Sequence, residues 1–551
     1  MLNRFAGRLA RVAAILALAA ALSGGPATAQ DSDNPCAYAP IDIGKYGGAP
    51  FANLPELRSE DGVLETTLTL GYADNEVAGC KVHLRSYNGA LVGPTFRVKP
   101  GDTLIVTIDN TLPPNPHHAP ADPNVPHGFN TTNLHTHGLH VSPVGNSDNV
   151  LLRIEPGESF QSEIKIPTDH PPGTFWYHAH VHGSTALQVS SGMAGALIIE
   201  GGLDDVPAIR EATEQTLLFQ QLAYDESGEI EGYAVFGPGQ WGQSHRQTLI
   251  NGQLVPTIRM RPGEVQRWRM IHAGVRETLL PVLKTTGRHP DEASVEAFGA
   301  AALSDLPRAA PLHELAVDGL ALGRIDTWDV VELLPGYRSD VLIKAPMVER
   351  PTLMLLTDGV LPSDRSLLGE PEPERVLARV VVGGEPADMA LPTPEQVAGL
   401  ALHDPITDAE LTGAPQTVVF NIAQRVCPPG QTCRPCAADE PDCKTRFMIN
   451  ARPFGMDHVR ELKLNTASEW TLSSLLASHP FHIHVHPFQT TRIGPDGQDQ
   501  IVWRDTLFVR QGDDPVTIRS RYQRYIGRFV LHCHILDHED QGMMELVEIV
   551  N

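Results

Sequence analysis

The sequence predicts an all-β protein built from several similar domains. Short runs of β-branched and apolar residues, closed by Gly, Pro, Asn or Asp, occur at 103–110, 195–202, 339–345 and 379–384, a pattern typical of β-strands. Long amphipathic helices are scarce, and the best helical candidate, 290–306, is interpreted as an insertion between strands. A chain of 551 residues exceeds one core, and domains of about 150 residues would give three or four.

A faint internal repeat supports this organisation. The stretches that begin at Arg97 and Arg259 both carry a basic residue, Pro-Gly, an acidic residue and alternating strand residues. Pro100 and Pro262 lie about one domain apart. A weaker echo begins at Leu462, where the Pro-Gly turn is replaced. We therefore expect a signal peptide at 1–29 and domains at 30–202, 203–400 and 401–551.

The charge balance is strongly acidic. Forty-two basic and sixty-six acidic side chains give a formal charge of -24. This charge repels nucleic acid and anionic membrane surfaces, and it could attract cations. A DNA-binding role is therefore not expected, although acidity is also a common means of solubility.

The N-terminus has the features of a secretory signal peptide. Arg4, Arg8 and Arg11 precede an apolar run, and Ala27-Thr28-Ala29 follows it. A basic start, a short apolar segment and an A-x-A site predict cleavage near Ala29 and export, to the periplasm or outside the cell. We expect no membrane span in the mature protein, because no second long apolar stretch follows.

Six of the seven cysteines can pair in an oxidising compartment. These are Cys36, Cys80, Cys427, Cys433, Cys436 and Cys443. A small metal knuckle is the alternative for the last four, although no histidine accompanies them. The pairing cannot be read from the sequence, and the odd cysteine is Cys533.

Four H-x-H pairs are the strongest signal in the chain. Residues two apart on a strand share a face and lie about 6.5 to 7 Å apart, so each pair can offer two imidazoles to one metal centre. A single pair is more often a solvated or hydrogen-bonded pair than a metal site, but four pairs exceed chance. They are His135 and His137, His178 and His180, His482 and His484, and His532 and His534.

The position of Cys533 between two histidines predicts two separate metal sites. On a strand, His532 and His534 face one way and Cys533 faces the other. Two histidines, one thiolate and a long axial methionine define a blue-copper centre, and His479, Cys533, His538 and Met543 fit these roles. The eight paired histidines could hold three more coppers, six around a pair and two on a third.

Together these clusters resemble the copper-binding signatures of the multicopper oxidases, and residues 250–274 resemble that family's middle domain. The resemblance implies three cupredoxin-like Greek-key domains, with four copper ions and dioxygen as the electron acceptor. It implies that His135 and His482 hold the lone copper of the cluster. It assigns the coupled pair to His137, His178, His180, His484, His532 and His534, and the blue copper to His479, Cys533, His538 and Met543, with Met544 as the alternative axial ligand.

Two acids also match the resemblance. Glu539 is similar to a carboxylate that feeds protons toward oxygen, and Asp148 to a second family acid, although its loop is about two residues longer here; either could instead be a surface residue. The extra histidines His140, His182 and His486 could orient ligands or could be ordinary core or surface histidines. The His117-His118 pair is expected at the surface.

The favoured activity is a laccase-like oxidation of phenols or aromatic amines in one-electron steps, coupled to the reduction of dioxygen to water. A metallo-oxidase acting on Cu(I), Fe(II) or Mn(II) in metal tolerance is the first rival. Only eleven methionines occur, and no methionine-rich run is present to hold Cu(I). A copper-free assembly factor and a two-domain copper nitrite reductase are further rivals, but every expected ligand position is filled. The substrate, redox potential and oligomeric state are not predicted.

Overall fold

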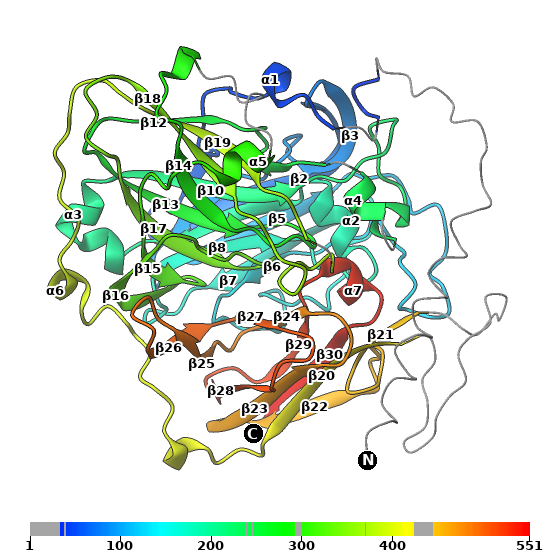
Figure 1. Ribbon diagram of the computed structural model, residues 1–551. Helices are drawn as coiled ribbons and strands as arrows, with labels where there is room; N and C mark the ends of the chain where they lie inside the picture. The colour runs from blue at the N-terminus through cyan, green and yellow to red at the C-terminus, as the bar shows by residue number, and fades with distance from the viewer. Residues whose placement is uncertain are drawn as a thin grey trace, which may run out of the picture.

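The computed structural model describes residues 34–37, 40–237, 240–244, 246–292, 300–369, 371–423 and 445–551. The predicted signal peptide and the cysteines at 427, 433, 436 and 443 lie outside these residues. The described chain forms six β-sheets that pair into three sandwiches (Figure 1). This confirms the predicted all-β fold with three cupredoxin-like domains.

The first sandwich contains two sheets, ordered β3-β2-β5-β7 and β1-β4-β9-β8-β6. Its strands are β1 Glu56–Arg58, β2 Val63–Val77, β3 Cys80–Tyr87, β4 Thr95–Val98, β5 Thr103–Asn110, β6 His135–His137, β7 Ser159–Lys165, β8 Gly173–His178 and β9 Ala194–Ile199. The short helices α1 Ile43–Tyr46 and α2 Thr185–Ser190 accompany it.

The middle sandwich has the sheets β11-β10-β13-β17-β15-β16 and β12-β19-β18-β14. Its strands are β10 Thr213–Gln221, β11 Thr248–Ile250, β12 Thr257–Met260, β13 Val265–His272, β14 Pro281–Thr285, β15 Leu312–Val317, β16 Leu320–Trp328, β17 Arg338–Lys344, β18 Thr352–Asp358 and β19 Arg375–Val382. Its helices are α3 Pro207–Arg210, α4 Gln240–Gln243, α5 Ala300–Ser304 and α6 Pro394–Val397.

The last sandwich has the sheets β21-β20-β23-β28-β25-β26 and β22-β30-β29-β24-β27. Its strands are β20 Gln416–Ala423, β21 Arg446–Ile449, β22 Val459–Lys463, β23 Thr466–Ser474, β24 His479–Ile483, β25 Phe488–Ile493, β26 Asp499–Arg504, β27 Thr506–Val509, β28 Val516–Tyr522, β29 Gly527–Cys533 and β30 Met544–Val550. Helix α7, Leu536–Asp540, follows β29 and lies on the side of this sandwich that faces the other two in Figure 1.

The repeat predicted from the sequence appears as three equivalent strands. β5, β13 and β23 each pair in parallel with an earlier strand, namely β2, β10 and β20. The turn before each strand holds a residue with positive φ, which is Gly101, Gly263 and, where Pro-Gly is replaced, Asn465. Glycine and asparagine tolerate this left-handed conformation best. The turn chemistry is therefore kept although the motif is not.

The four predicted strand runs are strands in the structure, whereas the predicted helical insertion is mostly not a helix among its described residues. The runs correspond to β5, β9, β17 and β19, so these strands are confirmed. The insertion contains only a 3₁₀ turn at Pro290–Glu292 and the five-residue α5 among its described residues. The sheets change between Ile199 and Thr213 and between Val382 and Gln416, and the domain limits near 203 and 400 stay predictions.

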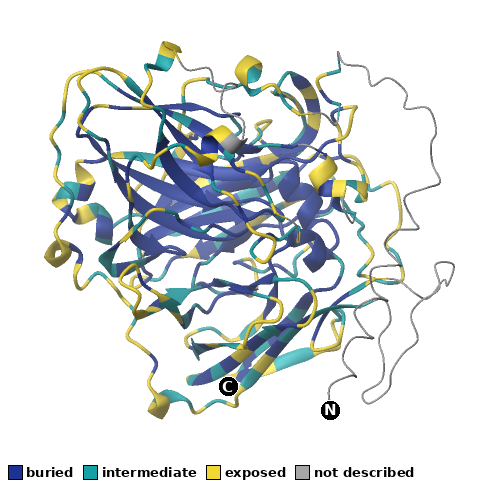
Figure 2. Cartoon of the chain, viewed as in Figure 1, coloured by how far each residue is buried: buried dark blue, intermediate teal, exposed yellow. Residues whose placement is uncertain are grey.

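Each sandwich buries its own apolar core between its two sheets, because alternate strand residues point inward. Phe175 in the first, Trp268 in the middle and Trp470 in the last sandwich are fully buried in these cores. Figure 2 shows the buried strands in the interior, with exposed residues mainly in peripheral loops and short helices. No described helix is long and apolar enough to cross a membrane.

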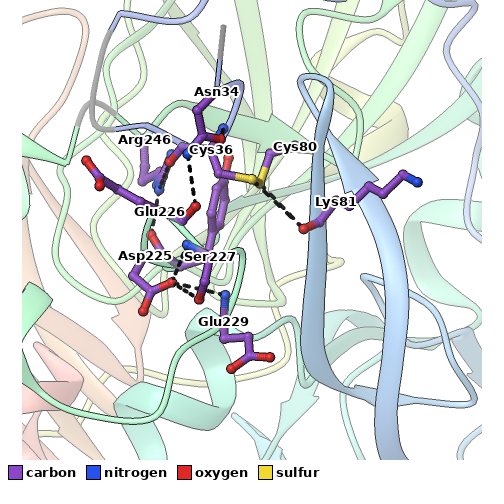
Figure 3. Close-up of a disulfide and its surroundings, with 10 residues drawn as sticks. Asn34, Cys36, Cys80, Lys81, Asp225, Glu226, Ser227, Glu229 and Arg246 are labelled. Atoms are coloured by element: carbon purple, nitrogen blue, oxygen red, sulfur yellow. Dashed lines mark hydrogen bonds between the residues drawn. A yellow bond between two sulfur atoms is a disulfide. The ribbon is translucent and has the colours of Figure 1, made fainter. Parts of the chain in front are cut away.

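A disulfide joins Cys36 to Cys80 at the start of β3. The N-terminal segment is also fixed by hydrogen bonds, because the Asn34 side chain donates to the Glu226 carbonyl and Arg246 donates to the Cys36 carbonyl (Figure 3). The bond confirms one of the pairings that six cysteines allowed.

Replacing both cysteines, Cys36→Ala with Cys80→Ala, is expected to lower the free energy of unfolding by about 2–4 kcal/mol. The bridge spans 44 residues, and removing it restores the entropy of that loop to the unfolded chain. Denaturant unfolding should show the first transition at a lower midpoint than in the parent protein. An unchanged midpoint would contradict a stabilising role for the bridge.

Candidate metal centres

The histidine pairs occupy equivalent strands in the first and last sandwiches. β6 and β8 carry His135, His137 and His178, and they pair with His135 opposite His178. β24 and β29 pair with His482 opposite His532. The corresponding strands of the middle sandwich, β14 and β18, contain no histidine. The fold therefore brings the pairs from the two ends of the chain together and leaves the middle sandwich without them.

Three donor atoms converge on one side of β29. Cys533 Sγ lies 3.3 Å from His479 Nδ1 and 4.0 Å from His538 Nδ1, and the two Nδ1 atoms are 3.4 Å apart. His479 donates its Nε2–H to the Leu476 carbonyl at 3.0 Å, which leaves its Nδ1 lone pair facing the sulfur. This set of one thiol and two imidazoles is the donor set that copper prefers in electron-transfer sites.

The two candidate axial methionines lie on opposite sides of the strand. Met543 is fully buried and packs in the same apolar cluster as Cys533 and Phe447. Met544 is paired with His532 in β30 and packs in a different cluster with Val530. Met543 therefore packs on the thiol side, and Met544 packs on the other side.

Burial raises the pKa of the Cys533 thiol well above its ordinary value. A thiolate at this position needs a bound cation, and metal coordination deprotonates a thiol outright. The extended backbone of His532 and Cys533 at the end of β29 agrees with the predicted strand. The sulfur and its two neighbouring imidazoles consequently point to different centres.

Eight imidazoles form the second cluster, and all are buried. His180 Nε2 and His484 Nε2 lie 3.2 and 3.3 Å from His532 Nε2. The ring centres of His137 and His534 are 5.0 Å apart. Other sets of donors within metal-binding reach are His135, His137 and His178, and His135, His482 and His484.

The hydrogen bonds of these rings orient their free nitrogens toward one another. The Nδ1–H groups of His178, His482 and His532 donate outward to the carbonyls of Ala179, Asp505 and Cys533, at 2.8 to 3.0 Å. A ligating imidazole normally donates its other N–H in this way. Several inward nitrogens have no hydrogen-bond partner, namely Nε2 of His135, His178, His482 and His534 and Nδ1 of His137.

These orphaned nitrogens fit bound metal ions. Leaving so many buried acceptors unsatisfied would cost about 1–3 kcal/mol each. Burial is the largest cause that lowers the pKa of every one of the eight imidazoles. The rings are thus neutral at neutral pH and their lone pairs are available, as metal binding requires.

Both predicted acids are buried beside the cluster, so the surface interpretation is wrong for each. Glu539 has no exposed surface, and its two carboxyl oxygens lie 3.5 Å from His180 Nδ1 and His532 Nδ1. Burial, followed by the charge of Asp540, raises the pKa of Glu539 well above its ordinary value. Both effects favour the protonated form of this carboxyl group.

Asp148 lies beside the first histidine pair. It accepts a hydrogen bond from the backbone N–H of Thr136 at 2.9 Å and contacts His135 Nδ1 at 3.1 Å. Burial raises the pKa of Asp148 to about 7. The longer loop that separates it from His137 does not move it away from the cluster.

Asp505 is a site residue that the sequence did not indicate. It directly precedes β27 in the sequence and is buried, with a carboxylate oxygen 3.1 Å from His137 Nε2. The carboxylate is paired with Arg338 of β17 at 2.5 and 2.8 Å. Burial alone would raise the pKa of Asp505, but the Arg338 guanidinium outweighs it and holds the pKa below its ordinary value. The ion pair joins all three sandwiches at the cluster.

An Arg338→Met variant is expected to lose about 3–5 kcal/mol of stability, because it leaves the Asp505 carboxylate buried and unpaired. The guanidinium also donates to the carbonyls of Gly336 and Asp318. Thermal unfolding followed against an exposed control, Arg350→Met, measures the loss. Equal unfolding of the two variants would show that the pair does not hold the sandwiches together.

Two more acids, both in α7, were not predicted from the sequence. Asp537 is paired with Arg276 of the middle sandwich at 2.6 Å. Asp540 accepts the backbone N–H groups of Gly183, Thr185 and Ala186. Both are buried, and they fix α7, with His538 and Glu539 on it, against the other two sandwiches. Their long-range partners could not be found from local sequence.

The extra histidines are not ring partners of the cluster. His182 Nε2 contacts the Asn124 side chain at 3.1 Å, and His140 Nδ1 contacts the Val485 carbonyl at 2.9 Å. His486 is buried against Phe529 and Tyr522. The alternative in which they orient ligand rings is therefore wrong, and His117 with His118 is exposed as expected.

The three β-sandwiches hold a buried site of one thiol and two imidazoles beside a cluster of eight imidazoles. This combination is typical of a copper-dependent redox protein. Comparison with known families agrees with this class. A family model described as multicopper oxidase matches residues 126–203, and a second of the same description matches residues 428–551. These segments contain all the predicted ligands.

Relatives extend the similarity over most of the chain. A laccase from Bacillus subtilis is 23% identical over 85% of this chain and 90% of its own length. A multicopper oxidase from Campylobacter jejuni, described as a metallo-oxidase, superposes with a TM-score of 0.69 at 24% identity, covering 92% of this chain and 97% of that one. A laccase-like multicopper oxidase from Ochrobactrum sp. superposes with a TM-score of 0.66 at 22% identity, covering 91% and 100%.

The chain belongs to the multicopper oxidase family. It is an oxidoreductase that uses dioxygen, and its family implies copper as the cofactor, which the histidine clusters fit.

Proposed function

We propose that the protein is a laccase-like oxidase that takes single electrons from phenols or aromatic amines and reduces dioxygen to water. His479, Cys533, His538 and Met543 would hold one type 1 copper. His135 and His482 would hold the type 2 copper, and His137, His178, His180, His484, His532 and His534 the two type 3 coppers. Bound copper supplies the one-electron redox couple that the side chains lack.

The observation that carries the proposal is the convergence of Cys533, His479 and His538 on one side of β29 while His532 and His534 point to the cluster. A single backbone segment thus links the two donor sets by covalent bonds. The sulfur is fully buried, so water is excluded from the path. This geometry suits transfer of electrons from a substrate site to an oxygen site.

His538 is the ligand through which an organic reductant would reach the thiol site. It is 8% exposed, whereas His479 and Cys533 have no exposed surface. The ring of His538 packs against Phe447 with centres 4.5 Å apart. Leu475 and Leu476, next to His479 in the sequence, are exposed, and apolar surface of this kind favours an aromatic reductant over a hydrated ion.

A metallo-oxidase acting on Cu(I), Fe(II) or Mn(II) is the second candidate. The likeness to the Campylobacter jejuni metallo-oxidase favours it, and so does the carboxylate of Asp537 beside His538. That carboxylate is already paired with Arg276, which reduces its capacity to bind a substrate cation. The ordering of the two candidates rests on this pairing and on the exposed leucines.

Oxygen uptake by copper-loaded protein with a phenol, an aromatic amine, Cu(I), Fe(II) and Mn(II) separates the candidates. The proposal expects phenol and amine turnover to exceed that of each metal ion. A Cys533→Ser variant supplies the background rate of uncatalysed oxidation. A preference for Cu(I), Fe(II) or Mn(II), with phenol turnover at background, would overturn the laccase-like assignment.

We also propose that the protein is exported, to the periplasm or beyond the cell. The disulfide between Cys36 and Cys80 supports this, because such bonds persist in oxidising compartments. Cell fractionation of the full chain should recover a product that begins near residue 30. Retention of the uncleaved chain in the cytoplasm would refute export.

A further inference from the structure

A cavity of about 590 Å³ lies where the first and last sandwiches meet the segment between β19 and β20. Four histidines line it, and none belongs to the copper ligands assigned above. They come from the loop after β6, the loop before β8, the segment before β20 and the loop after β24, and are His140, His170, His403 and His486. Their hydrogen bonds separate one structural histidine from three with free nitrogens.

His170 is the structural one. Its Nε2 accepts the backbone N–H of His140 at 3.0 Å, and its Nδ1–H donates to the Pro171 carbonyl at 2.9 Å. Both ring nitrogens are used, so this ring has no lone pair for a ligand. Its contribution is to fix the backbone of His140.

His140 has the orientation of a metal-binding imidazole. Its Nδ1–H donates to the Val485 carbonyl at 2.9 Å, which leaves the lone pair on Nε2. This is the same arrangement that His178, His482 and His532 show in the copper cluster. A carbonyl partner of this kind fixes the tautomer and ring orientation of a ligand.

His486 lies beside His140 in the cavity. Its side chain is 1% exposed and lines the cavity, its ring nitrogens make no hydrogen bond of good geometry, and the backbone of Arg521 is the polar group that faces it. The centre of its ring lies 5.3 Å from that of His140. A buried imidazole with an unsatisfied nitrogen is costly, at about 1–3 kcal/mol. A shared ion between the two rings would satisfy it.

His403 faces the same cavity from the segment between the middle and last sandwiches. Its Nε2 is buried without a partner, and its ring packs on Trp503 with centres 4.8 Å apart. It is half-buried, so an ion could reach the cavity past it. It is the third histidine of the cavity with a free ring nitrogen.

The charges around the cavity argue against an anion as the occupant. Arg524 is paired with Asp169 at 2.6 Å, and Arg521 is paired with Glu410 at 2.8 Å. The cationic groups are thus neutralised by their own partners. What remains free are neutral imidazole nitrogens, which accept late transition-metal ions and not anions.

We propose that His140 and His486, with His403 as the third ligand, form an additional site for one divalent ion of the Zn²⁺ or Ni²⁺ type, separate from the copper centres. The site would clamp the first and last sandwiches to the segment that connects the last two. It requires no redox change and no exchange with the oxygen cluster.

The test uses untagged, copper-loaded protein and Zn²⁺ as the probe, with equilibrium dialysis and elemental analysis of both metals. The expected result is one Zn²⁺ bound per chain with no copper released. His140→Gln and His403→Ala should each weaken Zn²⁺ binding by about 10-fold or more, the scale on which metal sites respond to altered partners. Zinc X-ray absorption should show imidazole nitrogens as ligands.

Two controls keep the test decisive. His182→Gln removes a comparable histidine outside the cavity, and His117→Gln with His118→Gln removes the exposed pair; both should bind Zn²⁺ like the parent. Equal Zn²⁺ affinity in the parent and in His140→Gln would overturn the proposal. Zn²⁺ uptake that only matches copper loss would overturn it as well, because the ion would then occupy a copper site.

Discussion

A Cys533→Ser variant is expected to lose its blue colour and to slow in phenol oxidation by more than about 100-fold, since altering even an outer partner of a metal ligand costs about 10- to 100-fold. Serine keeps the size of the side chain but replaces a soft sulfur with a hard oxygen, which copper binds poorly in such sites. It also removes the sulfur through which a copper held by His479 and His538 would connect to the backbone between His532 and His534. Visible absorption and oxygen uptake measure the two losses.

The matched control for this variant is Met544→Leu. Met544 is a buried methionine close to Met543 in the sequence, but it begins β30 and packs with Val530 on the opposite face from the thiol. It should retain both colour and turnover. Blue colour or phenol turnover that survives in Cys533→Ser would refute the role of the sulfur, and equal losses in both variants would indicate a general disturbance of the site.

A Glu539→Gln variant is expected to slow oxygen reduction by about 10²–10⁴-fold, the usual contribution of a positioned proton donor. Glu539 is buried between His180 and His532, and burial, followed by the nearby Asp540, raises its pKa, which favours the protonated form that can donate to oxygen. Glutamine keeps the shape of the side chain and can still accept a hydrogen bond from Thr185 Oγ1. It cannot release a proton to oxygen.

The same variant contains its own control. In the absence of oxygen, a phenol would reduce the copper held by His479, Cys533 and His538. This step does not involve Glu539, so it should proceed at the parent rate. Stopped-flow measurement of bleaching, followed by mixing with oxygen, separates the two half-reactions. Parent-like reoxidation in Glu539→Gln would exclude Glu539 as the proton donor.

The metal-binding strands were predictable because their signal is local. The alternation of an extended strand puts His532 and His534 on one face and Cys533 on the other, and it needs no knowledge of the rest of the fold. The three equivalent strands β5, β13 and β23 were likewise visible as a repeat. Only their turn chemistry survives in the third copy, where Asn465 adopts the positive φ of the two glycines.

The supporting residues were not predictable because their partners are distant in the chain. Asp505 is 368 positions from His137 and 167 from Arg338. Neither Asp505 nor Arg338 lies in a recognisable motif. The pairing of Cys36 with Cys80 depends on the same long-range folding. The 290–306 segment shows the opposite failure, since its helical composition produced only a 3₁₀ turn and the five-residue α5 among the described residues.

The most direct measurement is a crystal structure of the copper-loaded protein with anomalous scattering at the copper edge. The account predicts one peak among His479, Cys533 and His538, and three peaks enclosed by the eight histidines of β6, β8, β24, β29 and the residues that follow them. A missing peak at the Cys533 sulfur, or copper bound outside the eight-histidine cluster while the cluster itself is empty, would contradict it.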